Sequence, residues 1–174
     1  LTQPARSLVV EEYFSYGCIH CKNFDPELEE WLTTLPDDVR FERKPTAVSR
    51  TFSILALAYY ALEKAEALEG NHEQLFKGIH NGGRMFNSGQ DIADYLDSQS
   101  LPAREFMRAF DSRDVSRRLN RAAEDTRRSG IRAVPTMVVA GKYRVGMNQG
   151  AQRALEVTEY LLEQERVLIQ GQSG

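Results

Sequence analysis

The sequence predicts an α/β fold in which one mixed sheet is interrupted by a block of helices. β-branched and aromatic residues form runs near the start of the chain and again after residue 130. Between these runs, about 80 residues place their apolar side chains at helical spacing. The order strand, helix, strand, helical block, hairpin, helix brings the two ends of the chain into a single sheet. No segment of about 20–50 residues repeats, which argues against a solenoid.

The composition is that of a folded, soluble protein. The chain has 174 residues, enough for one domain or for one domain with a large insertion. Apolar residues make up 41% and charged residues 27%, with a net charge of -3. These values exclude a disordered tail and a strongly basic nucleic-acid binder. The longest unbroken apolar run, Ile54–Leu62, has nine residues, whereas a membrane span needs about 20.

The first part of the sheet is predicted from two strands and the helix between them. Leu8–Tyr16 is rich in β-branched and aromatic residues and ends in a turn, which is typical of a strand. A helical pattern begins at Cys18, and Pro26 inside it is expected to kink the helix. The pattern of Val39–Lys44 predicts a second strand, stopped by the proline that follows.

The helical block is predicted to contain five helices, with glycine, serine and proline residues marking several of their ends. They are Phe52–Leu68, His72–His80, a helix capped by Ser88 and ending near Leu96, Pro102–Phe110 and Val115–Arg128. Alternation of apolar and polar residues then returns over Ala133–Ala140 and Tyr143–Val145, joined by a turn at Gly141. A final amphipathic helix is expected over Ala151–Leu168.

The strongest chemical signal is Cys-Ile-His-Cys at residues 18–21, which holds both cysteines of the chain. It lies where a strand leads into a helix, and the unpaired N–H groups and dipole of a helix start stabilise an anion. A thiolate at Cys18 is therefore favoured, with His20 adding positive charge or a donor. Because the reduced form is stabilised, a Cys18–Cys21 disulfide becomes an oxidant. Cys21, one helical turn inward, is expected to be less exposed and to resolve a mixed disulfide.

Other uses of the cysteine pair are less well supported. A structural zinc site needs four ligands, and His72 and His80 stand eight residues apart in another segment. Haem attachment requires a histidine directly after the second cysteine, where Lys22 stands. A disulfide between residues three apart closes too short a loop to stabilise a fold appreciably. We therefore expect neither a metal nor an organic cofactor.

Two further positions are ambiguous from the residues alone. Pro135, in Ala-Val-Pro-Thr, is interpreted most simply as a turn residue before a strand, since only about 5–6% of X-Pro bonds are cis. Glu11 and Glu12 point to opposite faces of the first strand, so one of them is expected to face inward. A buried carboxylate without a partner has a raised pKa and can exchange a proton near neutral pH. The alternative for Glu12 is an exposed strand edge.

The arginine-rich segment between Arg113 and Arg132 is interpreted as a solvated helix face. Acidic residues, including Asp125, interleave with the arginines at helical spacing. Aromatic residues do not alternate with them as they do in single-stranded nucleic-acid sites. Phosphate-binding glycine loops and the Gly-x-Ser-x-Gly hydrolase motif are absent from the sequence. We expect no nucleic-acid partner.

The segments Val10–Cys21 and Arg132–Tyr143, with a helical block between them, resemble the DsbA-type thiol–disulfide oxidoreductases. The resemblance covers most of the chain, although these two segments carry its specificity. It implies a thioredoxin-like fold formed by residues 1–50 and 130–174, with a helical insertion over residues 51–129. Leu1–Ser7 barely represents the first strand usual in this family, so that edge strand is expected to be truncated.

The resemblance also implies roles for four residues around the cysteine motif. Cys18 corresponds to the exposed nucleophile and Cys21 to its buried partner. His20 corresponds to the histidine that stabilises the reduced thiolate. Glu12 corresponds to the buried acid beneath the disulfide.

The same resemblance places a substrate-binding surface beside the cysteines. Pro135 corresponds to a cis-proline facing them, where the backbone of Val134 and the side chain of Ile19 contact an extended substrate. Ile19 replaces the proline commonest in this family, so the redox potential does not carry over. Arg43 stands about where the family often has a lysine near the buried acid. A valine before the proline, as at position 134, is more typical of the oxidants of this family than of thioredoxin or the isomerases, which often have threonine there.

The implied activity is that of a monomeric oxidase acting on cysteine pairs of folding secreted proteins. The implied partner for reoxidation is a DsbB-like membrane oxidase. The implied compartment is the bacterial periplasm, with any targeting segment before Leu1 removed or never present. A disulfide isomerase or reductase on the same scaffold is the nearest alternative, although isomerases usually add an N-terminal dimerisation module. A redox-inactive binding module and a glutathione-using transferase are alternatives from other classes.

Overall fold

A four-stranded sheet joins the two ends of the chain. The computed structural model describes residues 8–171. The strands lie in the order β2 (Val39–Pro45), β1 (Leu8–Phe14), β3 (Thr136–Val139) and β4 (Tyr143–Val145). β1 and β2 are parallel, whereas β3 is antiparallel to both of its neighbours, β1 and β4. The predicted mixed sheet is confirmed.

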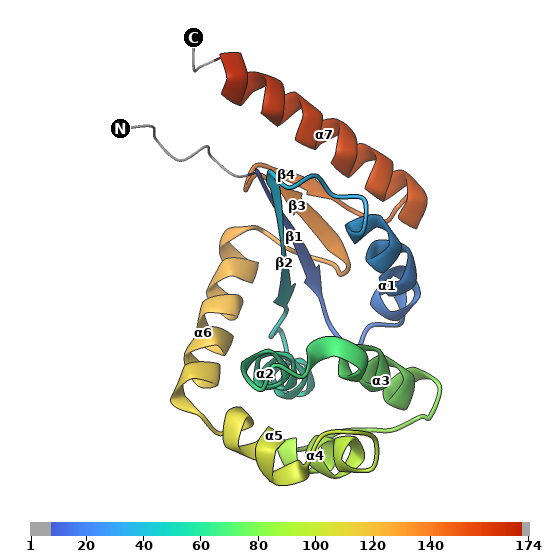
Figure 1. Ribbon diagram of the computed structural model, residues 1–174, viewed down its shortest axis with the longest axis vertical. Coiled ribbons are helices and arrows are strands. Elements are labelled where there is room, and N and C mark those ends of the chain that lie inside the picture. The colour runs from blue at the N-terminus through green and yellow to red at the C-terminus, as the bar shows by residue number, and fades with distance from the viewer. Residues whose placement is uncertain (1–7, 172–174) are drawn as a thin grey trace.

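Helices α1 (Ile19–Leu32) and α7 (Ala151–Gly171) cover one face of this sheet, as Figure 1 shows. Val10 of β1 packs in the same buried cluster as Leu28 of α1 and Leu162 of α7. The two helices are also joined by a hydrogen bond from Trp31 Nε1 to Glu159 Oε1, 2.9 Å long. Because side chains alternate along a strand, Glu12 faces the same side as Val10, towards α1.

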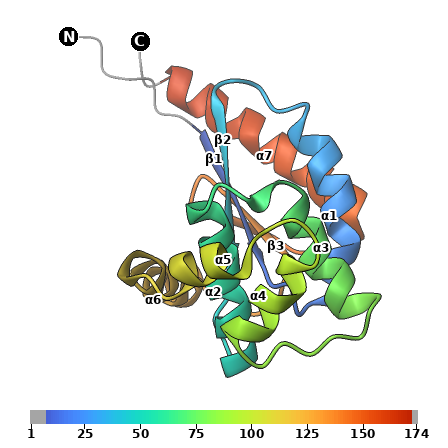
Figure 2. The same cartoon turned by 60° about the horizontal axis from the view of Figure 1, so that its bottom comes forward.

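Five helices lie between β2 and β3 in the chain. They are α2 (Arg50–Lys64), α3 (Leu68–His80), α4 (Gly89–Asp97), α5 (Ala103–Phe110) and α6 (Arg113–Arg128). Figures 1 and 2 show α3, α4 and α5 gathered at one end of the sheet, while α6 runs back beside β2. Serine side chains cap α2, α4 and α6 by accepting backbone N–H groups of the first turn. The helices share a buried core that includes Leu62, Leu75 and Phe106.

The cysteine motif lies where the sheet meets this helical core. Phe14 at the end of β1, Tyr16 in the following loop and Cys21 in α1 are all buried in the cluster formed mainly by α2–α6. The rings of Phe14 and Tyr16 meet edge to face, with centroids 5.3 Å apart. The β1–α1 loop is therefore held from both sides, by the sheet behind it and by the helices in front.

The predicted helices and strands are present with shifted ends. α2 stops at Lys64 rather than Leu68, and the chain turns through Glu66, whose φ is 54°. α3 begins at Leu68 and bends at Gly70, whose φ of 78° suits glycine. The strand expected over Ala133–Ala140 is only four residues long, since Pro135 cannot donate to the ladder. No helix among residues 8–171 is long and apolar enough to cross a membrane. The weak first strand expected over Leu1–Ser7 lies outside the described residues.

The prediction of a solvated arginine-rich helix is confirmed for most of its arginines but was wrong for Asp125. Arg117, Arg121 and most of their basic neighbours in α6 are exposed, as a solvated face requires. Asp125, however, is buried, because Lys44 Nζ of β2 lies 3.0 Å from its carboxylate. This side of α6 therefore packs along β2 through a partly buried ion pair, which local charge patterning did not indicate.

Candidate active site

Cys18 occupies the N-cap of α1, the position at which a side chain can accept from the free N–H groups of the helix. Its Sγ accepts a hydrogen bond from the backbone N–H of Cys21 at 3.3 Å. The strand-to-helix turn therefore aims the sulfur at the positive end of the helix. Cys18 is partly exposed, whereas Cys21 is fully buried, and both are free thiols.

The surroundings of Cys18 favour its anion. The thiol of Cys21 donates to Cys18, and this hydrogen bond is the largest influence lowering the Cys18 pKa to about 6. Partial burial opposes the shift, while backbone N–H groups of Cys21 and His20 and the charge of His20 favour it. At pH 7 most of this sulfur is therefore thiolate, the form that acts as nucleophile and leaving group.

Cys21 has the opposite preference. Burial raises the pKa of its thiol far above the usual range, and the hydrogen bond that it donates to Cys18 raises the pKa further. The nearby charges of Cys18 and Glu12 act in the same direction. The reduced pair therefore holds one proton, on Cys21. An arrangement of one accessible anionic sulfur and one buried protonated sulfur is suited to thiol–disulfide exchange.

Val134, which precedes Pro135, lies directly beside Cys18, although 116 positions separate the two residues in the chain. The Val134–Pro135 peptide bond is cis, as the family resemblance implies. Cys18 Sγ lies 3.5 Å from the Val134 carbonyl oxygen, to which the protonated thiol can donate. Ile19 next to it is 45% exposed, so an apolar side chain and a strand-end backbone flank the reactive sulfur.

Glu12 lies beneath the pair and faces inward, since only 1% of it is exposed. Its Oε2 accepts a hydrogen bond from Arg43 Nε at 3.1 Å. Burial nevertheless raises the pKa of Glu12 to about 7, because the attraction of Arg43 offsets only part of the desolvation and Asp25 adds repulsion. Near neutral pH this carboxyl can therefore either give or take a proton.

Sequence reasoning did not find a second buried carboxylate, Asp25 in α1. Arg43 Nη2 and His72 Nε2 both approach its Oδ1, at 3.1 and 3.0 Å. Burial favours the protonated form, but the hydrogen bond and charge of His72, together with Arg43, hold the pKa of Asp25 below its usual value. The ionised Asp25 can only accept hydrogen bonds, so His72 Nε2 carries a hydrogen.

His72 connects this carboxylate to the loop before the cysteines. The Tyr16 hydroxyl lies 2.7 Å from His72 Nδ1, and His80 Nε2 lies 2.7 Å from the Tyr16 carbonyl oxygen. Two histidines of α3 therefore fix the residue that stands two positions before Cys18. The only available signal in the sequence was the presence of two histidines eight residues apart, and these were considered only as weak zinc ligands.

The residues that come closest to a metal site are Asp25, Glu29 and His72, whose potential ligand atoms lie within 4.8 Å of one another. Arg43 Nη2 already forms ion pairs with both of these carboxylates. A guanidinium thus occupies the position of a cation, and the cysteines do not belong to this group. Within residues 8–171 these side chains are explained by their contacts with Arg43.

Comparisons with known proteins agree with this geometry. The family described as DSBA-like thioredoxin domain matches residues 9–162. The thiol:disulfide interchange protein DsbA of Azotobacter vinelandii is 33% identical over 168 residues, which cover 95% of this chain and 78% of that protein. The DsbA of Pseudomonas aeruginosa is 30% identical over 95% of this chain and 79% of its own length.

Solved structures show the same relationship. The crystal structure of Pseudomonas aeruginosa DsbA superimposes with a TM-score of 0.92 at 28% identity, covering 98% of this chain and 89% of that one. The oxidoreductase DsbA of Xylella fastidiosa superimposes with a TM-score of 0.88 at 27% identity, covering 95% and 90%. The expected thioredoxin-like fold is confirmed. The chain belongs to the DSBA-like thioredoxin domain family, and its activity is thiol:disulfide interchange, an oxidoreductase reaction.

Proposed function

We propose that the chain introduces disulfide bonds into folding secreted proteins through a disulfide between Cys18 and Cys21. The observation that carries this proposal is the contrast between the two sulfurs. Cys18 lies at the helix N-cap with a pKa of about 6, so its thiolate is stable in the reduced enzyme. A stable reduced form makes the disulfide a strong oxidant. The direction of exchange is therefore from enzyme disulfide to client dithiol.

The reaction proceeds by two exchanges. A client thiolate attacks Cys18 Sγ, the bond to Cys21 breaks, and Cys21 takes a proton from Glu12. A second client thiol then loses its proton to solvent and attacks the client sulfur of the mixed disulfide. Cys18 leaves as a thiolate, and the client retains the new disulfide. Two electrons have passed from the client to the enzyme. His20 assists by its charge near Cys18.

The client is proposed to bind in extended form beside Val134 and Pro135. This backbone precedes β3 and lies within hydrogen-bond distance of Cys18. Ile19 offers an exposed apolar contact on the other side of the sulfur. Backbone pairing and one apolar contact place few demands on the client's sequence, which suits an enzyme that acts on many unfolded chains.

The remaining expectations are part of the same proposal. The thioredoxin-like unit comprises residues 1–50 and 130–174, and the helical insertion residues 51–129. The enzyme acts as a monomer in the periplasm and is reoxidised by a DsbB-like membrane oxidase. Neither a metal nor an organic cofactor takes part, because the two sulfurs carry both electrons.

The decisive experiment measures the Cys18–Cys21 equilibrium in glutathione buffers and the oxidation of a peptide with two cysteines. We expect an oxidising couple and rapid transfer of the disulfide to the peptide. Cys18→Ser abolishes transfer, because the attacked sulfur is lost. Cys21→Ser is the matched variant: it cannot form the enzyme disulfide and so transfers none, but its Cys18 can still form a mixed disulfide with an oxidised peptide.

The possible outcomes separate the alternatives. A strongly reducing couple would overturn the oxidase assignment in favour of a reductase while leaving thiol:disulfide interchange intact. Reshuffling of a scrambled client with little net oxidation would indicate an isomerase. Unchanged function in Cys18→Ser, together with an ordinary Cys18 pKa, would indicate a binding module.

A further inference from the structure

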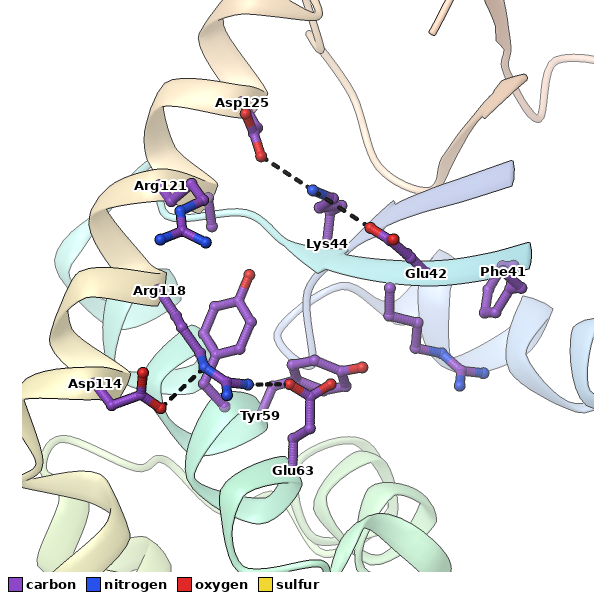
Figure 3. A pocket seen from close by; sticks show the side chains of 12 residues that line it. Phe41, Glu42, Lys44, Tyr59, Glu63, Asp114, Arg118, Arg121 and Asp125 are labelled. Atoms are coloured by element: carbon purple, nitrogen blue, oxygen red, sulfur yellow. Dashed lines mark hydrogen bonds and ion pairs between the residues drawn. The ribbon is translucent and has the colours of Figure 1, made fainter. Parts of the chain in front are cut away.

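A groove of about 640 Å³ lies between β2, α2 and α6, away from the cysteines. Figure 3 shows Arg118 and Arg121 extending from α6, Lys44 and Glu42 standing on β2, and Tyr59 coming from α2. The volume is in the range of small-molecule sites, roughly 300–1,000 Å³. Neither Cys18 nor Val134 lines it, so the groove is not accounted for by the exchange reaction.

Two tyrosines in the groove have hydroxyl groups without protein partners. Tyr59 and Tyr60 are only 5% and 9% exposed, yet among residues 8–171 neither hydroxyl has a hydrogen-bond partner. No fully buried side-chain oxygen lacks a partner in the same part of the chain. The small exposed part of each tyrosine therefore includes its hydroxyl, and both residues line the groove. Because each hydroxyl reaches the groove and has no protein partner, both are available to a ligand.

Among residues 8–171, one basic side chain that lines the groove has no acidic partner. Arg118 pairs with Glu63 and Asp114, and Lys44 pairs with Asp125 at 3.0 Å. The remaining acid, Glu42, has Arg40 at 3.0 Å and Lys44 at 3.6 Å. Every acidic side chain that lines the groove thus has a basic partner. The side chain of Arg121 has no ion pair or hydrogen bond to any residue of the described chain.

Among residues 8–171, three side-chain donors in the groove therefore have no protein partner: the Arg121 guanidinium and the hydroxyls of Tyr59 and Tyr60. An unpaired guanidinium presents a planar fork that matches a carboxylate, and two phenolic hydroxyls can donate to the same group. Phe41, which is partly exposed, supplies an apolar wall, whereas the rings of Tyr59 and Tyr60 pack into the helical core. The acidic side chains around the groove repel a phosphate dianion more than a carboxylate monoanion. The charges therefore favour a carboxylate ligand over a phosphate.

We propose that this groove binds a small organic carboxylate with an aromatic body, its acid group held by Arg121 and the hydroxyls of Tyr59 and Tyr60. The ring of the ligand packs against Phe41. This site is independent of the proposed exchange reaction, since it involves neither cysteine.

The test is a titration of the whole chain, followed by backbone amide NMR, with three probes. 3-Phenylpropionate is expected to give saturable shifts in α2, α6 and β2. 3-Phenylpropionamide, which has the same shape without the charge, is expected to bind at least about tenfold more weakly. Inorganic phosphate is expected to give no saturable shift there. Equal binding of the amide, or tighter binding of phosphate, would overturn the carboxylate assignment.

Matched variants locate the site. Arg121→Gln is expected to weaken 3-phenylpropionate binding about tenfold, whereas Arg117→Gln on the same helix leaves it unchanged. Tyr59→Phe and Tyr60→Phe are expected to weaken binding about threefold each, with no loss of thermal stability, because their hydroxyls have no protein partner. Equal effects of the two arginine variants, or loss of stability in the phenylalanine variants, would overturn the proposal.

Discussion

Cys18 and Cys21 lie one turn apart on the same helix, yet their surroundings favour opposite protonation states. Cys18 lies at the N-cap, where a thiol and backbone N–H groups donate to its sulfur and lower its pKa to about 6. Cys21 is enclosed by the helical core, and burial raises its pKa. The comparison shows that two cysteines one helical turn apart hold opposite protonation states when the helical core covers only one of them.

A similar contrast separates the two carboxylates beneath the motif. Glu12 and Asp25 are both buried and both contact Arg43. The pKa of Glu12 is raised to about 7, because burial outweighs its single guanidinium partner. The pKa of Asp25 is lowered, because His72 provides a second donor. Deeper burial and fewer donors therefore make Glu12, rather than Asp25, the carboxyl that holds a proton near neutral pH.

The sharpest test of the first contrast is selective alkylation of the reduced protein. At pH 7, Cys18 is expected to react with iodoacetamide more than about a thousandfold faster than Cys21, since thiolate fraction and access both favour it. Peptide mass spectrometry after short labelling measures the two rates. Alkylation of Cys18 is expected to fall away as the pH drops below about 6.

The Cys18→Ser variant provides the control, because Cys21 is then the sole thiol. Its labelling is expected to stay slow in the folded protein and to become fast in denaturant. Comparable labelling of both cysteines in the folded wild-type chain would contradict the assigned difference.

The next largest effect concerns Glu12 and the pH dependence of stability. The folded-state pKa of Glu12 is raised from 4.5 to about 7, so ionisation favours the unfolded chain. This group therefore lowers stability as the pH rises from about 4.5 to 7. From pH 5 to pH 8 its contribution is expected to decline by about 2 kcal/mol. Glu12→Gln removes that decline, which urea denaturation at the two pH values measures.

Glu11→Gln is the matched control for this measurement. Glu11 precedes Glu12 in β1 but points to the other face, where Lys44 Nζ lies 3.5 Å away. Cys18 also contributes to the pH dependence of stability, but its contribution is the same in both variants and cancels when they are compared. If Glu12→Gln and the wild type lose stability in parallel between pH 5 and pH 8, Glu12 does not hold a proton near neutrality.

Local sequence signals predicted the reactive cysteine and an inward-facing glutamate, but they missed the second buried carboxylate, Asp25, and its partner His72. The cysteine spacing and the strand-to-helix transition identified Cys18, and alternation along β1 predicted that Glu11 or Glu12 faces inward. Asp25 and His72 were missed, since 47 residues separate them and neither lies in a periodic pattern that marks a contact. Lys44 and Asp125, 81 residues apart, were missed for the same reason.

The place of Pro135 beside the cysteines could not be predicted from its own segment, because it depends on the pairing of distant strands. Pro135 alone was interpreted as a turn residue, and only its combination with the cysteines suggested a place beside them. The folded chain brings the Val134 carbonyl to 3.5 Å from Cys18 through the pairing of β3 with β1. Long-range strand pairing of this kind is not encoded in any short segment, whereas helix and strand periodicity is.

His72 provides a smaller test, directed at the second contrast. His72→Gln is expected to cost about 1–2 kcal/mol at pH 7, because Asp25 loses a buried charged hydrogen bond. The depressed pKa of Asp25 contributes stability above its ordinary pKa, and this is lost as the pH falls. The variant is therefore expected to differ less from the wild type at pH 3 than at pH 7.

The control is His80→Gln, in the same helix. His80 also contacts Tyr16, through the carbonyl oxygen, but it does not reach Asp25. The difference in stability between His80→Gln and the wild type is expected not to shrink between pH 7 and pH 3. A pH-independent loss in His72→Gln would show that the histidine acts only through packing.

The smallest effect is expected for His20, the charged residue within the motif. His20 is exposed, and its charge is the least of the named influences that lower the Cys18 pKa, after the Cys21 thiol and the backbone N–H groups. His20→Ala is therefore expected to raise the Cys18 pKa by about one unit or less, and the difference should shrink at high salt. Thiolate absorbance against pH at two salt concentrations measures both. A rise of two units or more, insensitive to salt, would mean that His20 rather than the helix start holds the anion.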